Sequence, residues 1–96
     1  MIVDDYLDYQ YTYQKKYGDK TIVLMQVGSF FEAYAIDGDD EKINVDNLYY
    51  ICDLMNIQIS RKNKSILKSS RSNPLMAGFP LVAIDKFIQI LMNNHL

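Results

Sequence analysis

The two side chains in this sequence best suited to contact another molecule are Phe30 and Glu32, an aromatic ring and a carboxylate two positions apart. They lie in the apolar stretch MQVGSFFEAY, residues 25–34, whose composition is typical of a β-strand. Because successive side chains of a strand point to opposite faces, Phe30 and Glu32 share one face and Phe31 takes the other. An exposed ring beside a hydrogen-bond acceptor can stack on a flat ring and bind its edge, which is chemistry suited to a nucleobase.

The glutamate favours discrimination over general affinity for nucleic acid, because phosphates repel a carboxylate. Wedging an aromatic ring between base pairs costs stacking energy, and the cost is smallest where pairing is already faulty. The same spacing is also compatible with Phe30 in the core and Glu32 solvated. The pair alone leaves both interpretations open.

A second feature is a cluster of cations with no acid near it. Between Leu54 and Ile84 the chain contains no Asp or Glu, although the net charge of the whole chain is -2. The cations of this segment are Arg61, Lys62, Lys64, Lys68 and Arg71. The segment fits a solvated loop, and it also fits a contact with a polyanion such as nucleic acid.

Composition limits the class of protein. With 96 residues, 49% of them hydrophobic, the chain can form the core of one domain without disulfides. Cys52 is the only cysteine and is expected to be a reduced core thiol, and His95 alone leaves too few ligands for a metal site. The chain has no apolar run of membrane-spanning length and no basic leader, so we expect an intracellular, soluble protein without a membrane partner. Its many Ile, Lys, Asn and Tyr residues are typical of an AT-rich genome, viral or organellar.

Hydrophobic periodicity and turn residues predict an alternation of helices and strands. We expect helices over residues 4–17, 45–55 and 80–93, and strands over 21–27, 29–36, 57–60 and 75–79. One face of the first helix is expected to be a packing surface: Tyr6, Tyr9 or Gln10, Tyr13 and Tyr17. The order predicts an α/β domain with a small mixed β-sheet flanked by helices. The chain ends where a further strand is expected, so we interpret residues 1–96 as one domain of a larger protein.

Several segments resemble the N-terminal mismatch-recognition domain of the MutS family of DNA mismatch-repair proteins. VGSFFEAY (residues 27–34) resembles the family segment G-D-F-Y-E-L-F, and PLMAGFP (74–80) resembles P-M-A-G-I-P. Between them, ICDLMNIQISRK fits a helix that runs into a strand ending in basic residues, and AIDKFIQILMNN resembles the helix after the second motif. The resemblance extends from about Tyr13 to Asn94 and departs from the family at Ser29 and Phe31, where Asp and Tyr are usual.

The resemblance implies a role for individual residues. Phe30 corresponds to the phenylalanine that wedges beside a mispaired base, and Glu32 to the glutamate that hydrogen-bonds that base. Arg61 and Lys62 correspond to a basic pair that approaches the DNA backbone, and Lys64 is expected to help hold phosphates. The implied partner is double-stranded DNA with mispairs or small loops.

The second motif contributes Met76 and Gly78. Gly78 is expected to permit a tight backbone path, and Met76 fits core packing and DNA contact equally well. The sequence contains no phosphate-binding loop, so no cofactor and no enzymatic activity are expected of this chain. The resemblance implies that the full-length protein is a dimeric ATPase that uses ATP and magnesium.

Two other functions remain open from the residues alone. One is a structural or protein-binding α/β module that does not recognise mismatches, for which a buried Phe30 would be expected. The other is a metal-dependent nuclease built on the acidic turn DGDDEK, with Asp37, Glu41 and Lys42 as candidate residues.

Overall fold

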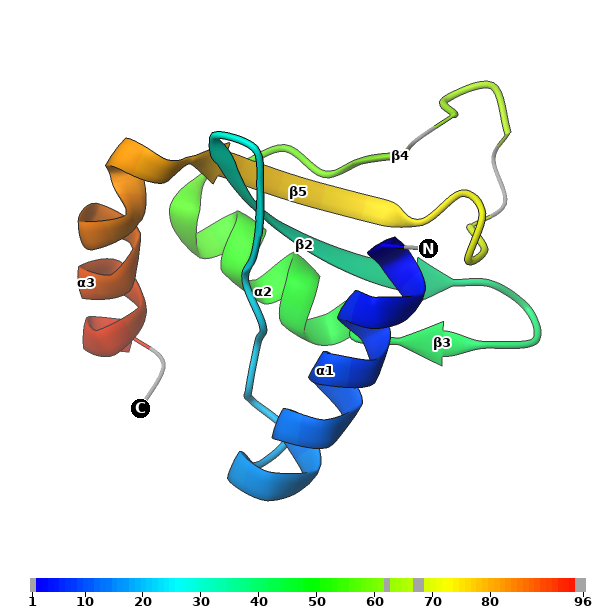
Figure 1. Cartoon of the computed structure of the whole chain (residues 1–96), viewed down its shortest axis with the longest axis horizontal. Coiled ribbons are helices and arrows are strands. Elements are labelled where there is room, and N and C mark those ends of the chain that lie inside the picture. Colours follow the sequence, from blue (N-terminus) through cyan, green and yellow to red (C-terminus); the bar gives the residue numbers. More distant parts are fainter. Residues whose placement is uncertain (1, 62, 67–68, 95–96) are drawn as a thin grey trace.

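A computed structural model describes residues 2–61, 63–66 and 69–94. The predicted order of elements is confirmed, with a short strand and a 3-10 turn added (Figure 1). The elements are α1 (Ile2–Tyr17), β1 (Met25–Val27), β2 (Phe30–Asp37), β3 (Lys42–Ile43), α2 (Val45–Met55), β4 (Ser60–Arg61), β5 (Leu75–Pro80), η1 (Leu81–Ala83) and α3 (Ile84–Asn94).

The strands form a sheet in the order β1-β2-β5-β4, and β3 pairs with the far end of β2. All pairings recorded between these strands are antiparallel, and the longest one joins β2 to β5 from Phe30↔Pro80 to Ala35↔Leu75. Within the described residues, the chain is therefore a small α/β domain with a five-stranded antiparallel sheet and three helices.

Helices pack on both faces of the sheet. On one face Tyr34 of β2 packs edge-to-face on Tyr6 of α1, with ring centroids 5.2 Å apart. On the other face Phe79 of β5 lies 5.8 Å from Phe31 and 4.0 Å from Phe87 of α3, again between ring centroids. The predicted inward side of α2 is confirmed, because its four residues are all buried: Leu48, Ile51, Cys52 and Met55.

The predicted strand over residues 21–27 is wrong for its first four residues. Their backbone N–H and carbonyl groups form hydrogen bonds with side chains of α1 instead of with a neighbouring strand. Gln10 accepts a hydrogen bond from the Val23 N–H (2.8 Å) and donates one to the Thr21 carbonyl (2.7 Å). The hydroxyl of Tyr6 donates to the Val23 carbonyl at 2.8 Å. This segment is therefore tied to α1, and strand pairing begins only at Met25.

The predicted packing surface of α1 is correct for Tyr6 and for the alternative Gln10, but wrong for the other three tyrosines. Tyr9, Tyr13 and Tyr17 are exposed and stack on one another along the helix. The buried side of the helix consists of Val3, Tyr6, Leu7 and Gln10. The predicted strand over residues 57–60 is also displaced, since β4 comprises only Ser60 and Arg61.

Candidate nucleic-acid interface

Phe30 begins β2, directly after the turn that joins β1 to β2. Gly28 has a φ of 61° there, a conformation that side chains with a Cβ rarely adopt. The Ser29 carbonyl accepts a hydrogen bond of 2.9 Å from the Leu81 N–H, which fastens this turn to the end of β5. Phe30 is 45% exposed, so the exposure expected of a wedge residue is present.

Glu32 lies on the same face as Phe30, two residues further along β2. It is half-buried, and its neighbours in the register are Met25 of β1 and Gly78 of β5. Its Oε1 accepts a hydrogen bond from the hydroxyl of Tyr34, the next residue of β2 on this face. The carboxylate is thus held by the protein rather than freely solvated.

Tyr34 is itself held by a small polar cluster beneath α1. Asn44 donates from Nδ2 to the Tyr34 carbonyl (3.0 Å) and to the Tyr6 hydroxyl (3.2 Å). Burial is the largest cause that raises the pKa of both tyrosine hydroxyls far above the ordinary value, and Glu32 raises the pKa of Tyr34 further. Both hydroxyls therefore stay protonated and act as donors at neutral pH.

Met76 shares the face of Glu32, where its register neighbours are Tyr34 of β2 and Ser60 of β4. The side chain is half-buried and packs against the hydrophobic core. Of the two roles left open by the sequence, core packing is therefore realised. Contact with DNA stays a prediction.

Arg61 occupies the other face of the sheet. Its register neighbour is Leu75, one position from Met76, so its side chain points opposite to Phe30 and Glu32. With Lys64 and Tyr49 it lines a hollow of about 580 Å³ at the β4 edge. Its Nε atom is buried and has no hydrogen-bond partner in the part of the chain that the structure describes.

The predicted site residues thus form two groups on opposite faces. Phe30, Glu32 and Met76 share one face, whereas Arg61 and Lys64 line a hollow on the other. The turn between β1 and β2 and residues 63–66, which come after β4, also lie at different ends of the sheet (Figure 1). Lys62 and Lys68 lie outside the described residues.

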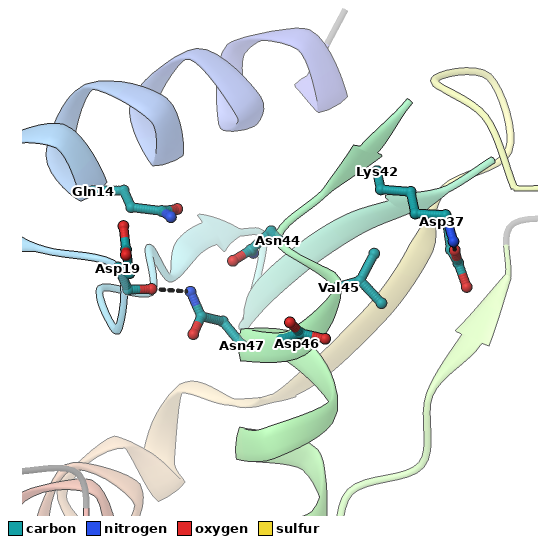
Figure 2. Close-up of a pocket in the computed structure, with 8 residues that line it drawn as sticks. All are labelled: Gln14, Asp19, Asp37, Lys42, Asn44, Val45, Asp46 and Asn47. Atoms are coloured by element: carbon teal, nitrogen blue, oxygen red, sulfur yellow. Dashed lines mark hydrogen bonds and ion pairs between the residues drawn. The ribbon is translucent and has the colours of Figure 1, made fainter. Parts of the chain in front are cut away.

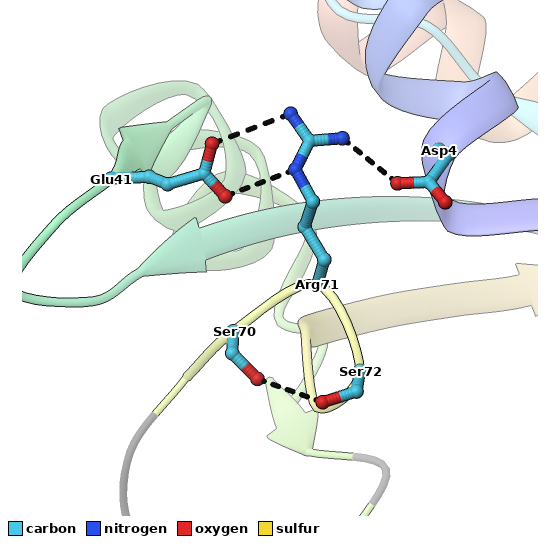
Figure 3. A network of polar contacts seen from close by, with 5 residues as sticks. All are labelled: Asp4, Glu41, Ser70, Arg71 and Ser72. Carbon is cyan, nitrogen blue, oxygen red and sulfur yellow. Dashed lines mark hydrogen bonds and ion pairs between the residues drawn. The ribbon is translucent and has the colours of Figure 1, made fainter.

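Arg71, the last cation of the basic segment, is engaged by two acids (Figure 3). Its Nη1 lies 2.8 Å from an Asp4 oxygen, and its Nε lies 3.0 Å from an oxygen of Glu41. Arg71 therefore links α1, the turn after β2 and the loop before β5. The sequence did not reveal this pairing, because its partners are 67 and 30 residues away along the chain.

The acidic turn does not assemble a metal centre. Lys42 Nζ lies 3.6 Å from an Asp37 oxygen, and Glu41 is taken by Arg71. Both Asp37 and Lys42 border a polar hollow of about 500 Å³, in which Asn47 donates to the Asp19 carbonyl (Figure 2). Among the described residues there is no group of three His, Cys, Asp or Glu side chains that could hold a metal ion.

Sequence reasoning missed Tyr34 as a partner of Glu32. The signal was available, because residues two apart on a strand share a face and a tyrosine hydroxyl can reach a neighbouring carboxylate. None of the helices within the described residues has the length and apolar character needed to span a membrane.

The fold is a small antiparallel α/β domain, and an exposed phenylalanine lies beside a half-buried glutamate at one end of its sheet. No family model matches the chain. It is 34% identical over 90 residues to a protein of Acanthamoeba polyphaga mimivirus named as a DNA mismatch repair protein and mutS homolog. The match covers 93% of this chain but only 8% of that protein. The chain is therefore similar to a short region of a MutS homolog.

Proposed function

We propose that this chain is the mismatch-recognition domain of a MutS-type protein and binds double-stranded DNA that contains mispairs or small loops. The observation that carries the proposal is the exposed ring of Phe30 beside Glu32 on one face of β2. The similarity to a mutS homolog supports a link to DNA mismatch repair.

In this proposal, Phe30 stacks against a mispaired base and opens the duplex at that point. The stacking energy lost by the DNA is smallest at a faulty pair, so the wedge favours mispairs. Glu32 binds the edge of the base that Phe30 has displaced. Its negative charge disfavours correctly paired DNA, whose phosphates approach without any compensating hydrogen bond.

Arg61 and Lys64 supply affinity for phosphates that does not depend on sequence. Because they line the other face of the sheet, they would contact a different stretch of backbone from the one beside Phe30. The chain itself is proposed to be no enzyme and to need no cofactor. ATP, magnesium and dimerisation are proposed for the full-length protein only.

The test is a titration of matched and mismatched duplexes with the full-length protein and its Phe30→Ala variant. We expect the variant to lose the preference for mismatched duplex while most of the salt-sensitive binding to matched duplex remains. Tyr17→Ala is the matched control, because it removes another exposed aromatic ring and is expected to leave the preference intact. Equal discrimination by the wild type and Phe30→Ala would refute the proposal.

A second variant, Glu32→Ala, separates base reading from general affinity. We expect it to weaken binding to mismatched duplex and to leave or raise the affinity for matched duplex. A large and equal loss on both duplexes would contradict a reading role for Glu32.

A further inference from the structure

The carboxylate of Glu32 has two oxygens, and the structure shows a protein partner for one of them. The Tyr34 hydroxyl donates to Oε1. Both residues lie on β2, on the same face, so the contact needs no distant element to form. Glu32 is only half-buried, so the carboxylate remains accessible beside the exposed Phe30 ring.

The donor is fixed more firmly than a surface tyrosine would be. The ring of Tyr34 is buried against Tyr6, and Asn44 ties both the Tyr34 backbone and the Tyr6 hydroxyl. Tyr6 in turn donates to the Val23 carbonyl. A hydroxyl held in this way restricts the rotamers of the glutamate that accepts from it, so the carboxylate loses little further freedom when it binds a ligand.

The geometry points to Tyr34 as the positioning residue of Glu32: its hydroxyl occupies Oε1, so that Oε2 is the oxygen presented to the base beside Phe30. This inference rests on the proposed function. It adds a specificity-determining residue that does not itself touch DNA. The raised pKa of Tyr34 agrees with it, because a hydroxyl that stays protonated remains a donor to the carboxylate.

The decisive variant is Tyr34→Phe, which removes the hydroxyl and keeps the ring. The family segment that this stretch resembles ends in phenylalanine at this position, so the packing is expected to accommodate the change. With full-length protein, we expect Tyr34→Phe to reduce the preference for mismatched duplex roughly fivefold to tenfold. The affinity for matched duplex is expected to stay unchanged, which a general loss of structure would not produce.

Tyr9→Phe is the control. It also removes a tyrosine hydroxyl, but one on the exposed side of α1, outside the cluster that holds Tyr34. We expect it to leave the mismatch preference intact. In a Glu32→Ala background, Tyr34→Phe is expected to have no further effect on discrimination, because the group that it positions is gone.

The outcomes separate this inference from the proposed function. If Glu32→Ala loses discrimination and Tyr34→Phe keeps it, the positioning role is overturned and the proposed function stands. If the wild-type protein does not discriminate, the proposed function fails. The hydrogen bond between Tyr34 and Glu32 is then tested in the DNA-free protein by the 13C chemical shift of the Glu32 carboxyl carbon. We expect that shift to move in Tyr34→Phe and not in Tyr9→Phe. An unmoved signal would overturn the inference.

Discussion

Gly78 of β5 lies directly across from Glu32 of β2, and the absence of a side chain there makes room for the glutamate. A Cβ atom at Gly78 would lie 3.3 Å from Glu32 Cγ and 3.1 Å from the Phe31 carbonyl oxygen. Gly78 of the second motif, PLMAGFP, thus lies against Glu32 of the first motif, VGSFFEAY. The expectation that Gly78 permits a tight backbone path is met, because a Cβ atom there would crowd β2. The side chain that gains space is that of Glu32.

Gly78→Ala is expected to destabilise the domain by about 1 kcal/mol, because the added methyl group crowds a packed strand pair. In a Glu32→Ala background the cost is expected to be smaller, because Glu32 Cγ is absent and only the contact with the Phe31 carbonyl oxygen remains. Urea unfolding of the four variants in the cycle measures both values. An identical loss of unfolding free energy in both backgrounds would show that the added methyl group does not crowd Glu32.

Tyr6→Phe is expected to lower the free energy of unfolding by about 1–2 kcal/mol. The loss arises because the Val23 carbonyl and the Asn44 amide both give up a partner in the interior. Tyr9→Phe is the matched control, since Tyr9 lies on the exposed side of the same helix and should be neutral. Equal unfolding midpoints for both variants in urea would contradict a structural role for the Tyr6 hydroxyl.

Arg71→Ala is expected to cause a small loss of thermal stability that depends on salt. Its ion pairs with Asp4 and Glu41 are partly exposed, so salt screens them. The difference in melting temperature from the wild type should therefore be largest at low ionic strength and shrink as salt is added. Lys64→Ala is a suitable control, because no ion pair is recorded for that exposed side chain and no such trend is expected. A difference that is constant with salt would argue against the ion pairs as its cause.

Cys52 gives a prediction for pH. Burial raises the pKa of its thiol from 9.0 to about 11. Between these values the unfolded chain has lost the proton that the folded chain keeps, so the unfolded state binds fewer protons and stability falls as pH rises. The contribution is complete below about pH 9 and is lost as pH approaches 11.

The pH effect is measured as the slope of unfolding free energy against pH, which should be shallower for Cys52→Ala over this window. In a second measurement, iodoacetamide should modify native Cys52 slowly at pH 8 and rapidly after unfolding. Rapid alkylation of the native protein would contradict the buried, protonated thiol.

Local sequence patterns predicted best those features that depend on one helix or one strand alone. The apolar period of residues 45–55 predicted the inward side of α2 correctly, because Leu48, Ile51, Cys52 and Met55 all pack into the core. The alternation in β2 placed Phe30 and Glu32 on one face, as the register confirms. In both cases a single element determines the direction of the side chains.

Prediction failed where contacts distant in sequence decide the outcome. Residues 21–24 have the composition of a strand, but Gln10 and Tyr6 take their backbone groups, and the sequence does not disclose that pairing. The basic segment that contains Arg71 fitted a solvated loop or a contact with a polyanion, and the sequence offered no acid near it, yet Asp4 and Glu41 contact Arg71 in the fold. The roles of the site residues toward DNA stay predictions.

The placement of Phe30 and Arg61 on opposite faces of one sheet limits how a single partner can meet them. An elongated, rigid partner that lies against one face of the sheet can contact either the Phe30 ring or the Arg61 guanidinium, but not both. Any one molecule that engages both must curve around the rim of the domain. A partner that bends easily at one point would curve around the edge of the domain more readily than a uniformly rigid one.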